Sequence, residues 1–373
     1  MTIDYKSLGL MSGTSGDGVD ASIIQSDGAK KYKVLVDKYF KYSQTISSNI
    51  HNLKRKINSH SDIKKFSEEI KVLERDITIF HAKSVIEIIN ESKINIDFIG
   101  FHGQTIFHDS QKKLSFQLGD GKLLSQLVKK DVIFDFRQND INKGGEGAPL
   151  SPIFHKLISD QYKLNLPLCF LNIGGIANIT LIQDKNFNNL ISRDIGPGNC
   201  MIDEWVRNNS KFNYDKDGRL SQAGTTNKIV LEQVEEFFLK NIEKQSSLDT
   251  KDFDISFVRG LSLEDGASTL TDFTAQIIVS QLHTFIGNDK SKNYKILLCG
   301  GGRKNKNLIN KIKEIIASNF KVELIDKYDI DGDFVESQAF AYLAIRSLLK
   351  LPISFPNTTG CSEPSTGGIF VKY

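Results

Sequence analysis

The chain has 373 residues, of which 39% are hydrophobic and 25% charged, and its 48 basic and 45 acidic residues leave a formal net charge of +3. This length suits two domains, and the composition is typical of a globular protein. Because the basic residues are spread among the acidic ones, we expect neither a nucleic acid nor a membrane as a partner.

The first half opens with a predicted antiparallel meander of three strands. Ser7–Met11, Val19–Gln25 and Tyr32–Tyr39 are apolar, β-branched or alternating, and turns that carry glycine separate them. Between Ile46 and Glu91, apolar residues recur three or four positions apart, which predicts amphipathic helices. Two short buried strands follow, each before a polar loop with glycine: Ile96–Phe101 and Val132–Phe136.

The second half repeats this plan. Its predicted strands are Leu168–Ile173, Ile179–Ile182, Leu190–Ile195 and Ile296–Cys299. The polar stretch 208–226 predicts a surface insertion. Helical periodicity predicts long helices at Ile229–Phe238, Ser268–Phe285, Lys304–Ala317 and Phe334–Leu349.

Two halves that each begin with strand, glycine turn and strand predict the duplication of one α/β unit. A polar stretch at Asp160–Leu166 precedes the first strand of the second half. We therefore place an N-terminal domain at 1–160 and a C-terminal domain at 161–373. The last helix is expected to pack back on the first domain.

A glycine-rich hairpin is the first motif that indicates chemistry. In Gly9–Asp20, four glycines surround hydroxyl residues, and the backbone N–H groups can converge on an anion such as phosphate. It is not a Walker A loop, because no Gly-Lys-Ser/Thr follows. Asp17 is a candidate ligand for Mg²⁺ beside the phosphates, although it could instead only bond the backbone of a tight turn. The predicted ATP contacts are Gly9, Leu10, Met11, Ser12, Gly13, Thr14, Ser15, Gly16 and Asp17.

Three further glycine motifs lie in the second half: a second hairpin at Asn172–Asn178, a strand end at Asp194–Asn199, and a turn at Cys299–Asn305 that allows a flat ligand close to the backbone. Each alone could be only a turn. Together with the first hairpin they resemble the layout of the actin/hexokinase/Hsp70 superfamily. That resemblance implies two duplicated ribonuclease H-like domains around an interdomain nucleotide cleft. The predicted ATP contacts are Asn172, Gly174, Gly175, Asn178, Asp194, Gly196, Gly198, Gly300, Gly301 and Gly302.

An acid beyond the strand Val132–Phe136 is the candidate base. Asp140 stands three residues after Arg137, where a carboxylate can project into a cleft. Phosphoryl transfer requires the protein mainly to position the nucleophile and stabilise charge, so one such carboxylate suffices. The alternative is that Asp140 caps a helix N-terminus, with Arg137 as its surface partner.

Polar residues beyond Phe101 form a predicted sugar-contact surface. His102, Gln104 and Thr105 lie just past the buried strand that ends there. A single histidine is more often structural than catalytic, so we assign His102 no acid–base role.

Cysteine and histidine usage excludes other kinds of site. The seven histidines show no spacing typical of paired metal ligands. No apolar run approaches the roughly 20 residues that span a bilayer. The N-terminus lacks the apolar core of a signal peptide. We therefore expect neither a disulfide framework nor a transition metal, and a cytoplasmic location. The cysteines, which form no C-x-x-C pair, are Cys169, Cys200, Cys299 and Cys361.

In these segments the chain closely resembles the anhydro-N-acetylmuramic acid kinases. Eight blocks run in family order from residue 9 to about 344, and the tail from Leu351 to Gly360 also fits. The blocks are GLMSGTSGDGVDAS from Gly9, IGFHGQTIFH from Ile99, FQLGDG from Phe116, DFRQNDINKGGEGAPLSPIFH from Asp135, LNIGGIANIT from Leu171, DIGPGNCMID from Asp194, CGGGRKN from Cys299 and ESQAFAYLA from Glu336.

The resemblance implies a double reaction on 1,6-anhydro-N-acetylmuramic acid. Water adds at C1 and opens the internal ether, and the γ-phosphate of ATP, used with Mg²⁺, moves to O6, which serves cell-wall recycling. Asp140 matches the base that activates the water, and Gly9–Gly16 match the ATP-binding loop. Arg137, Gly147 and Glu336 are further expected sugar contacts. Analogy with the family also favours a homodimer.

Three positions depart from the family pattern. Gly16 stands where many members carry leucine, Glu146 stands where glutamine is common, and Lys244–Ser247 replaces a stretch that is usually proline-rich. Glu146 could alter the sugar contacts. The first alternative is therefore a sugar kinase that acts on another anhydrosugar. The second is a nucleotide-gated binding or assembly protein of the actin or Hsp70 kind, against which the short chain and Asp140 count.

Overall fold

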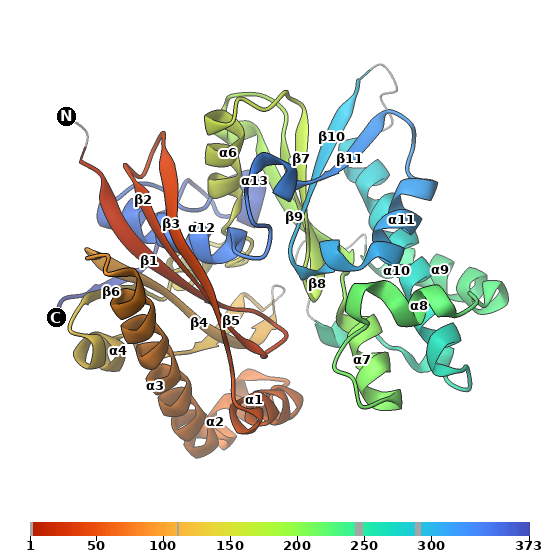
Figure 1. Cartoon of the computed structure of the whole chain (residues 1–373), viewed down its shortest axis with the longest axis horizontal. Coiled ribbons are helices and arrows are strands. Elements are labelled where there is room, and N and C mark those ends of the chain that lie inside the picture. Colours follow the sequence, from red (N-terminus) through yellow and green to blue (C-terminus); the bar gives the residue numbers. More distant parts are fainter. Residues whose placement is uncertain (1–2, 110–111, 243–247, 249, 288–291) are drawn as a thin grey trace. The chain divides into compact units, whose positions relative to one another are not determined.

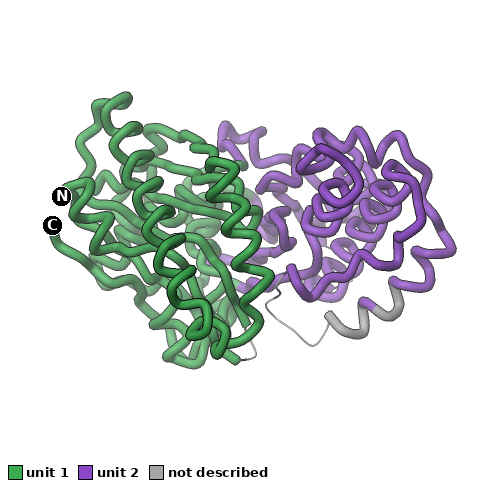
Figure 2. Tube along the Cα trace, turned by 90° about the horizontal axis from the view of Figure 1, so that it is seen from below, with its two compact units in different colours: residues 1–164, 186–190, 333–373 green, residues 165–185, 191–332 purple. Residues whose placement is uncertain are grey.

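A computed structural model describes residues 3–109, 112–242, 248, 250–287 and 292–373. Lys244–Ser247, one of the departures from the family pattern, lies outside the described residues. The contacts group the chain into two compact units (Figure 2), of which unit 1 is Met1–Leu164, Asn186–Leu190 and Asp333–Tyr373 and unit 2 is Asn165–Lys185 and Ile191–Gly332. The C-terminal residues therefore group with unit 1, while the domain limits at 160 and 161 stay predictions.

Unit 1 is built on a seven-stranded sheet with the order β12-β6-β4-β1-β2-β3, in which β5 pairs with β4 (Figure 1). The predicted meander is confirmed, because β1, β2 and β3 are antiparallel neighbours. β4 lies parallel to β1, and β6 parallel to β4. The strands are β1 (Tyr5–Ser12), β2 (Gly18–Ser26), β3 (Tyr32–Lys41), β4 (Phe98–Asp109), β5 (Leu114–Leu118), β6 (Asp131–Phe134) and β12 (Ile369–Val371).

β4 is longer than the predicted strand at this place. β5 pairs with its second half, where Gln104 faces Leu118 and Thr105 faces Gln117. His102, Gln104 and Thr105 therefore lie within the strand, and the prediction that they follow it was wrong. The cause is Gly103, which suggested a turn but takes a φ of +78° inside a paired strand.

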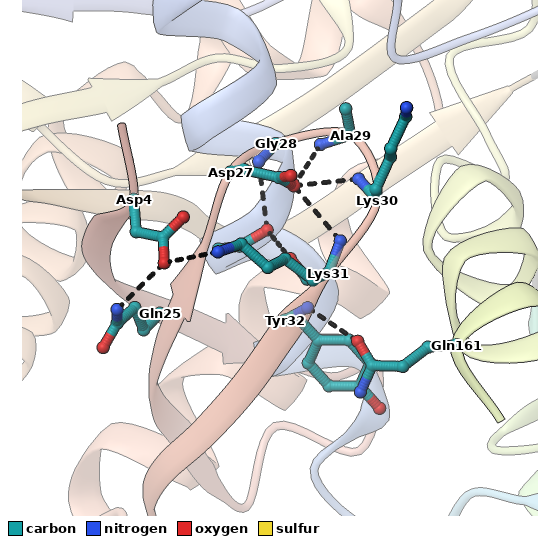
Figure 3. A network of polar contacts seen from close by, with 10 residues as sticks. Asp4, Gln25, Asp27, Gly28, Ala29, Lys30, Lys31, Tyr32 and Gln161 are labelled. Carbon is teal, nitrogen blue, oxygen red and sulfur yellow. Dashed lines mark hydrogen bonds and ion pairs between the residues drawn. The ribbon is translucent and has the colours of Figure 1, made fainter. Parts of the chain in front are cut away.

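A local network shapes the turn between β2 and β3 (Figure 3). The carboxylate of Asp27 accepts the backbone N–H groups of Ala29, Lys30 and Lys31 at 2.8–3.1 Å. Burial alone would raise the pKa of Asp27, but these N–H groups hold it below its usual value. Asp27 with Gly28, whose φ is +74°, thus makes the tight turn that the sequence predicts.

Helices cover the sheet of unit 1 because their apolar residues recur on one face. In the helix that contains them, Ile70, Leu73 and Ile77 are buried, as their spacing predicts. The helices are α1 (Gln44–Lys56), α2 (His60–Lys65), α3 (Ser67–Ser92), α4 (Gly121–Val128), α5 (Gln138–Asn142), α6 (Pro152–Gln161), α12 (Val335–Leu348) and α13 (Pro356–Thr359), with the 3-10 turn η1 (Phe187–Asn189).

The helix α12 packs closely on β1, β2 and β4 (Figure 1). Two strand glycines make this approach possible. A Cβ at Gly9 would lie 2.0 Å from the carbonyl oxygen of Ser337, and a Cβ at Gly100 would lie 2.4 Å from that of Phe340. Gly9 therefore lies within β1 and not in a loop, and its lack of a side chain lets α12 pack closely.

Unit 2 repeats the strand order of unit 1 on its own five-stranded sheet, β11-β10-β7-β8-β9. In both units a hairpin pairs the first two strands, and the fourth main strand lies parallel to the first on its other side. The predicted duplication of one α/β unit is confirmed. The strands are β7 (Leu168–Ile173), β8 (Ile176–Ile182), β9 (Leu190–Pro197), β10 (Tyr294–Cys299) and β11 (Phe320–Leu324).

The stretch 208–226, predicted to be a surface insertion, is partly buried. Its helix α8 packs on α10, Ser221 is 1% exposed, and the carboxylate of Asp215 caps the helix by accepting the N–H groups of Leu220 and Ser221. In the described part of the chain no helix is long and apolar enough to cross a membrane. The helices are α7 (Cys200–Asn209), η2 (Lys216–Gly218), α8 (Arg219–Ala223), α9 (Lys228–Ile242), η3 (Thr250–Asp252), η4 (Ser256–Val258), α10 (Leu263–Ile286), η5 (Gly301–Lys304), α11 (Lys306–Ile315) and η6 (Ile325–Tyr328).

Candidate active site

The loop between β1 and β2 is short and glycine-bearing. Among the predicted ATP contacts, Gly13, Thr14, Ser15, Gly16 and Asp17 form it, and the Gly16 N–H donates to the Gly13 carbonyl oxygen at 3.2 Å. Gly16 needs its lack of a side chain, since its φ is +61°. The other predicted contacts on this hairpin lie inside β1: Gly9, Leu10, Met11 and Ser12.

A buried glutamine holds this loop. Ser12 Oγ donates to Gln104 Oε1 at 2.6 Å, and Gln104 Nε2 donates to the carbonyl oxygen of Gly13 at 2.9 Å. Gln104 is fully buried. Its amide therefore orders the hairpin, whereas Thr105, predicted beside it on the sugar surface, accepts from Gln117 Nε2 at 3.3 Å.

Lys54 is a further residue at this hairpin, and the motifs did not identify it. Its Nζ donates to the carbonyl oxygen of Thr14 at 2.9 Å, although the residue is only 9% exposed. The sequence carries a clue, because Lys54 continues the four-residue spacing of Ile46 and Ile50 on the apolar face of α1. A lysine at such a position must direct its ammonium to a polar partner.

The candidate magnesium ligand, Asp17, is exposed at the end of the loop, and Ser15 Oγ donates to one of its carboxylate oxygens. No group of three or more His, Cys, Asp or Glu side chains that could hold a metal occurs among the described residues. Mg²⁺ keeps several waters and needs only one or two carboxylates beside substrate phosphates, so a single exposed carboxylate fits it.

The candidate base, Asp140, is fixed from two sides. Its Oδ1 accepts the hydroxyl of Thr359 at 2.6 Å and its Oδ2 accepts the Gly147 N–H at 2.8 Å, and the residue is 1% exposed. Gly145 passes so close that a Cβ there would lie 2.2 Å from Oδ2. The alternative of a helix cap is wrong, because Asp140 lies inside α5 and Arg137 is its N-cap residue.

Gly147 connects Asp140 to a second polar group. While its N–H donates to Asp140, its carbonyl oxygen accepts Arg137 Nη1 at 3.1 Å. Arg137 also donates to His102 Nε2, from Nη2 at 2.9 Å and from Nε at 3.1 Å. The structure thus brings together four of the predicted catalytic and sugar-binding residues in unit 1.

The histidine in this group is neutral. Burial, and after it the charge of Arg137, hold the pKa of His102 well below its usual value of 6.5. Its Nδ1 lies 2.8 Å from the carbonyl oxygen of Gly103, so Nδ1 carries the proton and Nε2 is free to accept from Arg137. His102 orients the guanidinium, consistent with the absence of an acid–base role.

Glu336, the predicted sugar contact on α12, interacts electrostatically with the guanidinium of Arg137. Burial raises the pKa of Glu336, and the charge of Arg137 partly opposes this rise. A carboxyl of raised pKa beside an arginine is typical of functional sites as well as of structural pairs.

In unit 2 the second hairpin and two glycine motifs meet. The Gly198 N–H donates to the carbonyl oxygen of Gly175 at 2.9 Å, and a Cβ at Gly198 would lie 2.2 Å from that of Gly174. A Cβ at Gly300 would lie 2.2 Å from Asn172 Oδ1. A Cβ at Gly302 would come about as close to the side chain of Ile173, whereas a Cβ at Gly301 would meet no atom within 4 Å.

The remaining predicted contacts of unit 2 lie in its strands. Asn178 faces Asn172 across the β7–β8 hairpin, and Gly196, with a φ of +148°, lies in β9. Asp194 is 9% exposed and its Oδ2 accepts the Leu248 N–H at 2.8 Å. That bond ties β9 to the segment before α10.

Arg303 fixes the glycine turn after β10. It donates to both carboxylate oxygens of Asp326 at 2.7 and 2.8 Å, to Asp331 at 3.0 Å, and to the carbonyl oxygen of Gly300 at 3.1 Å. Its hydrogen bonds are the largest cause that lowers the pKa of Asp326. No role was predicted for Arg303 from the sequence, because its carboxylate partners Asp326 and Asp331 follow more than twenty residues later.

A cavity of about 500 Å³ also lies in unit 2. Asp272, Gln276 and Lys311 are among the residues around it, and no predicted site residue lines it. The predicted phosphate and glycine motifs therefore lie outside this cavity.

Comparison with known proteins places these observations in a family context. The model of the family described as "Anhydro-N-acetylmuramic acid kinase" matches residues 5–372. The protein of that name from Pelagibacter ubique is 54% identical over 99% of this chain and 98% of its own length. The Zymomonas mobilis protein of the same name is 38% identical over 97% of this chain and 98% of its own length.

A likeness to a solved structure is weaker. The activator of the 2-hydroxyisocaproyl-CoA dehydratase from Clostridium difficile, with bound ADPNP, is 11% identical with a TM-score of 0.43, and the match covers 92% of this chain and 96% of that chain. At this level the likeness carries no argument about what the present chain binds.

Proposed function

Because the chain belongs to the anhydro-N-acetylmuramic acid kinase family over nearly its whole length, we propose that Asp140 is the base of its reaction. The chain is accordingly a phosphotransferase that uses ATP and acts in the recycling of anhydro-N-acetylmuramic acid. A cytoplasmic location, expected from cysteine usage, and a homodimer, expected from the resemblance, remain predictions.

The proposed reaction balances as one hydration and one phosphoryl transfer. A water oxygen bonds to C1 of the 1,6-anhydro sugar, and the proton of that water passes to Asp140. The C1–O6 bond breaks with its electrons on O6, which attacks the γ-phosphorus, and the bond to the bridging oxygen of ADP breaks. The products are N-acetylmuramic acid 6-phosphate and ADP.

One observation carries the assignment of Asp140. Its carboxylate is held by the Thr359 hydroxyl and the Gly147 N–H, and Gly147 in turn is bonded by Arg137. A base must be held in place near bound substrate, and Arg137, Gly147, Glu336 and His102 were all expected on the sugar side. Asp140, Gly147, Arg137 and His102 thus form one hydrogen-bonded group, and Glu336 interacts with the charge of Arg137.

The phosphate-binding role falls to the two hairpins. The proposed phosphate contacts are the backbone N–H groups of Gly13 to Ser15 in unit 1 and of Gly175 in unit 2. The N–H groups of Gly16 and Gly174 already donate to the carbonyl oxygens of Gly13 and Ile176. Lys54 adds a positive charge at the first hairpin. Asp17 would hold Mg²⁺, which neutralises charge on the transferring phosphate.

The test is the product formed from 1,6-anhydro-N-acetylmuramic acid, Mg²⁺ and ATP. We expect ADP and a sugar whose mass has increased by one water and one phosphoryl unit (HPO3), with the phosphate on O6 by NMR. N-acetylmuramic acid, which has no 1,6-anhydro bridge to open, is the control acceptor. The proposal fails if the anhydro sugar is not consumed, or if another anhydrosugar is turned over much faster.

A further inference from the structure

We propose that Thr359, which lies 219 positions along the chain from Asp140, is a positioning residue that orients the Asp140 carboxylate for its role as base. This inference rests on the proposed function. It adds to that function a residue from the C-terminal segment, a part of the chain in which no site residue was expected apart from Glu336.

The contact between the two residues is short and buried. Thr359 Oγ1 lies 2.6 Å from Asp140 Oδ1, and the two residues are 2% and 1% exposed. The hydroxyl has one proton, and its other acceptor, the carbonyl oxygen of Phe355, is 3.5 Å away. Thr359 therefore donates to Asp140, and a hydrogen bond to a charged group is about twice as strong as a neutral one.

The backbone around Thr359 is fixed to the same region. The Glu146 N–H donates to the Thr359 carbonyl oxygen at 2.8 Å, one residue before the Gly147 N–H that holds the other carboxylate oxygen. As a β-branched residue, Thr359 has a stiff χ1, so a fixed backbone also fixes its hydroxyl. Both hydrogen bonds to Asp140 thus come from neighbouring, mutually bonded segments.

The C-terminal segment after α13 is attached to α5 by three further contacts. The Ser362 N–H donates to the Lys143 carbonyl oxygen at 3.0 Å, Asn139 Nδ2 donates to that of Thr366 at 2.6 Å, and Lys143 pairs with Glu363 at 2.8 Å. These contacts hold the segment against α5 and so keep the Thr359 hydroxyl beside Asp140. The segment is thereby part of the proposed site and not only a tail.

The arrangement leaves Asp140 able to accept a proton. The two carboxylate oxygens have four lone pairs in all, and their neighbours are the Thr359 hydroxyl, the Gly147 N–H and the Cys361 thiol, so a lone pair remains for the proton of water. Thr359 keeps its own proton throughout and touches no reacting atom. By bonding to Oδ1 it keeps the Asp140 carboxylate from rotating.

The experiment compares Thr359→Val, Thr359→Ser and the neighbouring Thr358→Val. Thr358 is the matched control, because its hydroxyl bonds only the backbone of Phe355 within the same helix. We expect Thr359→Val to lower kcat by about 10- to 100-fold with little change in KM. Thr359→Ser, which keeps the hydroxyl, should restore kcat.

The outcomes separate this inference from the proposed function. If the wild type does not consume the anhydro sugar, the proposed function itself fails. If the wild type is active and Asp140→Asn is not, but folded Thr359→Val keeps the wild-type kcat, only the role of Thr359 is overturned. Equal losses of kcat in Thr359→Val and Thr358→Val, or a Thr359→Ser variant as slow as Thr359→Val, would also overturn it. Should Thr359→Val not fold, Thr359→Ala is measured in its place.

Discussion

Lys54 and Thr14 are joined across the first hairpin: the ammonium of the helix residue donates to the loop carbonyl oxygen at 2.9 Å. A buried cation thus supports the loop that we propose to bind phosphate. Electrostatic stabilisation by such groups is a main part of phosphoryl transfer.

Lys54→Met should therefore weaken the use of ATP. The methionine keeps an unbranched apolar stem but removes the charged donor, whose hydrogen bond is worth about 1.5–3 kcal/mol. We expect KM for ATP to rise about tenfold or more. Lys56→Met is the control, since Lys56 lies on the same helix and pairs with Glu69 at the surface. Equal KM values for ATP in the two variants would show that Lys54 does not contribute to the ATP site.

Gly16→Leu should destabilise the fold. The φ of +61° costs a residue with a side chain about 1–2 kcal/mol, and a Cβ would lie 2.9 Å from Ile50 Cγ2. Gly13→Ala is the matched control, because a Cβ there meets nothing closer than 3.8 Å. Urea denaturation gives the free energies of unfolding. A Gly16→Leu variant as stable as the wild type would mean that the loop takes another backbone path when leucine is present, as in many family members.

Arg303→Met should loosen the glycine turn of unit 2. The change removes the paired bonds to Asp326 and the bond to the Gly300 carbonyl oxygen, at a cost of about 1–3 kcal/mol in the free energy of unfolding. KM for ATP should rise as well if this turn contacts adenosine. Lys306→Met, at an exposed position of α11, is the control. Unchanged stability would contradict the role given to Arg303.

The buried imidazole of His81 makes stability depend on pH. Burial lowers the pKa of His81 to about 4. As the pH falls from about 6.5 towards 4, the unfolded chain binds a proton that the folded chain does not, so each pH unit costs up to ~1.4 kcal/mol of stability. His81→Phe keeps the ring packing on Phe101 and removes this term. Its stability should fall less steeply with pH than that of His60→Gln, an exposed control. Equal slopes would contradict the assignment.

The strands and glycine turns were predictable because their determinants are local. Alternating or β-branched residues between turns placed β1, β2, β3 and β7 within a few residues of their observed limits. The turn at Asp27 and Gly28 follows from side-chain bonds to the next residues in the chain. The candidate base Asp140 was singled out because it follows such a strand.

The supporting contacts of the site were not predictable in the same way. Thr359 meets Asp140 across 219 positions, and Arg137 meets His102 across 35. No periodicity encodes such pairs, since they depend on how separate elements pack. β5, β11 and β12 were missed for the same reason, because short strands need a partner to be stable.

The measurement that tests the central claim most directly is the rate of ADP release with 1,6-anhydro-N-acetylmuramic acid and Mg-ATP, for the wild type and Asp140→Asn. Asp131→Asn, an acid on β6 whose carboxylate bonds the Tyr373 N–H, is the control for loss of a carboxylate elsewhere in unit 1. We expect Asp140→Asn alone to lose about 10²–10⁴ in rate while it still binds ATP, because it lacks the general base. An Asp140→Asn enzyme that turns over like the wild type would show that the base lies elsewhere.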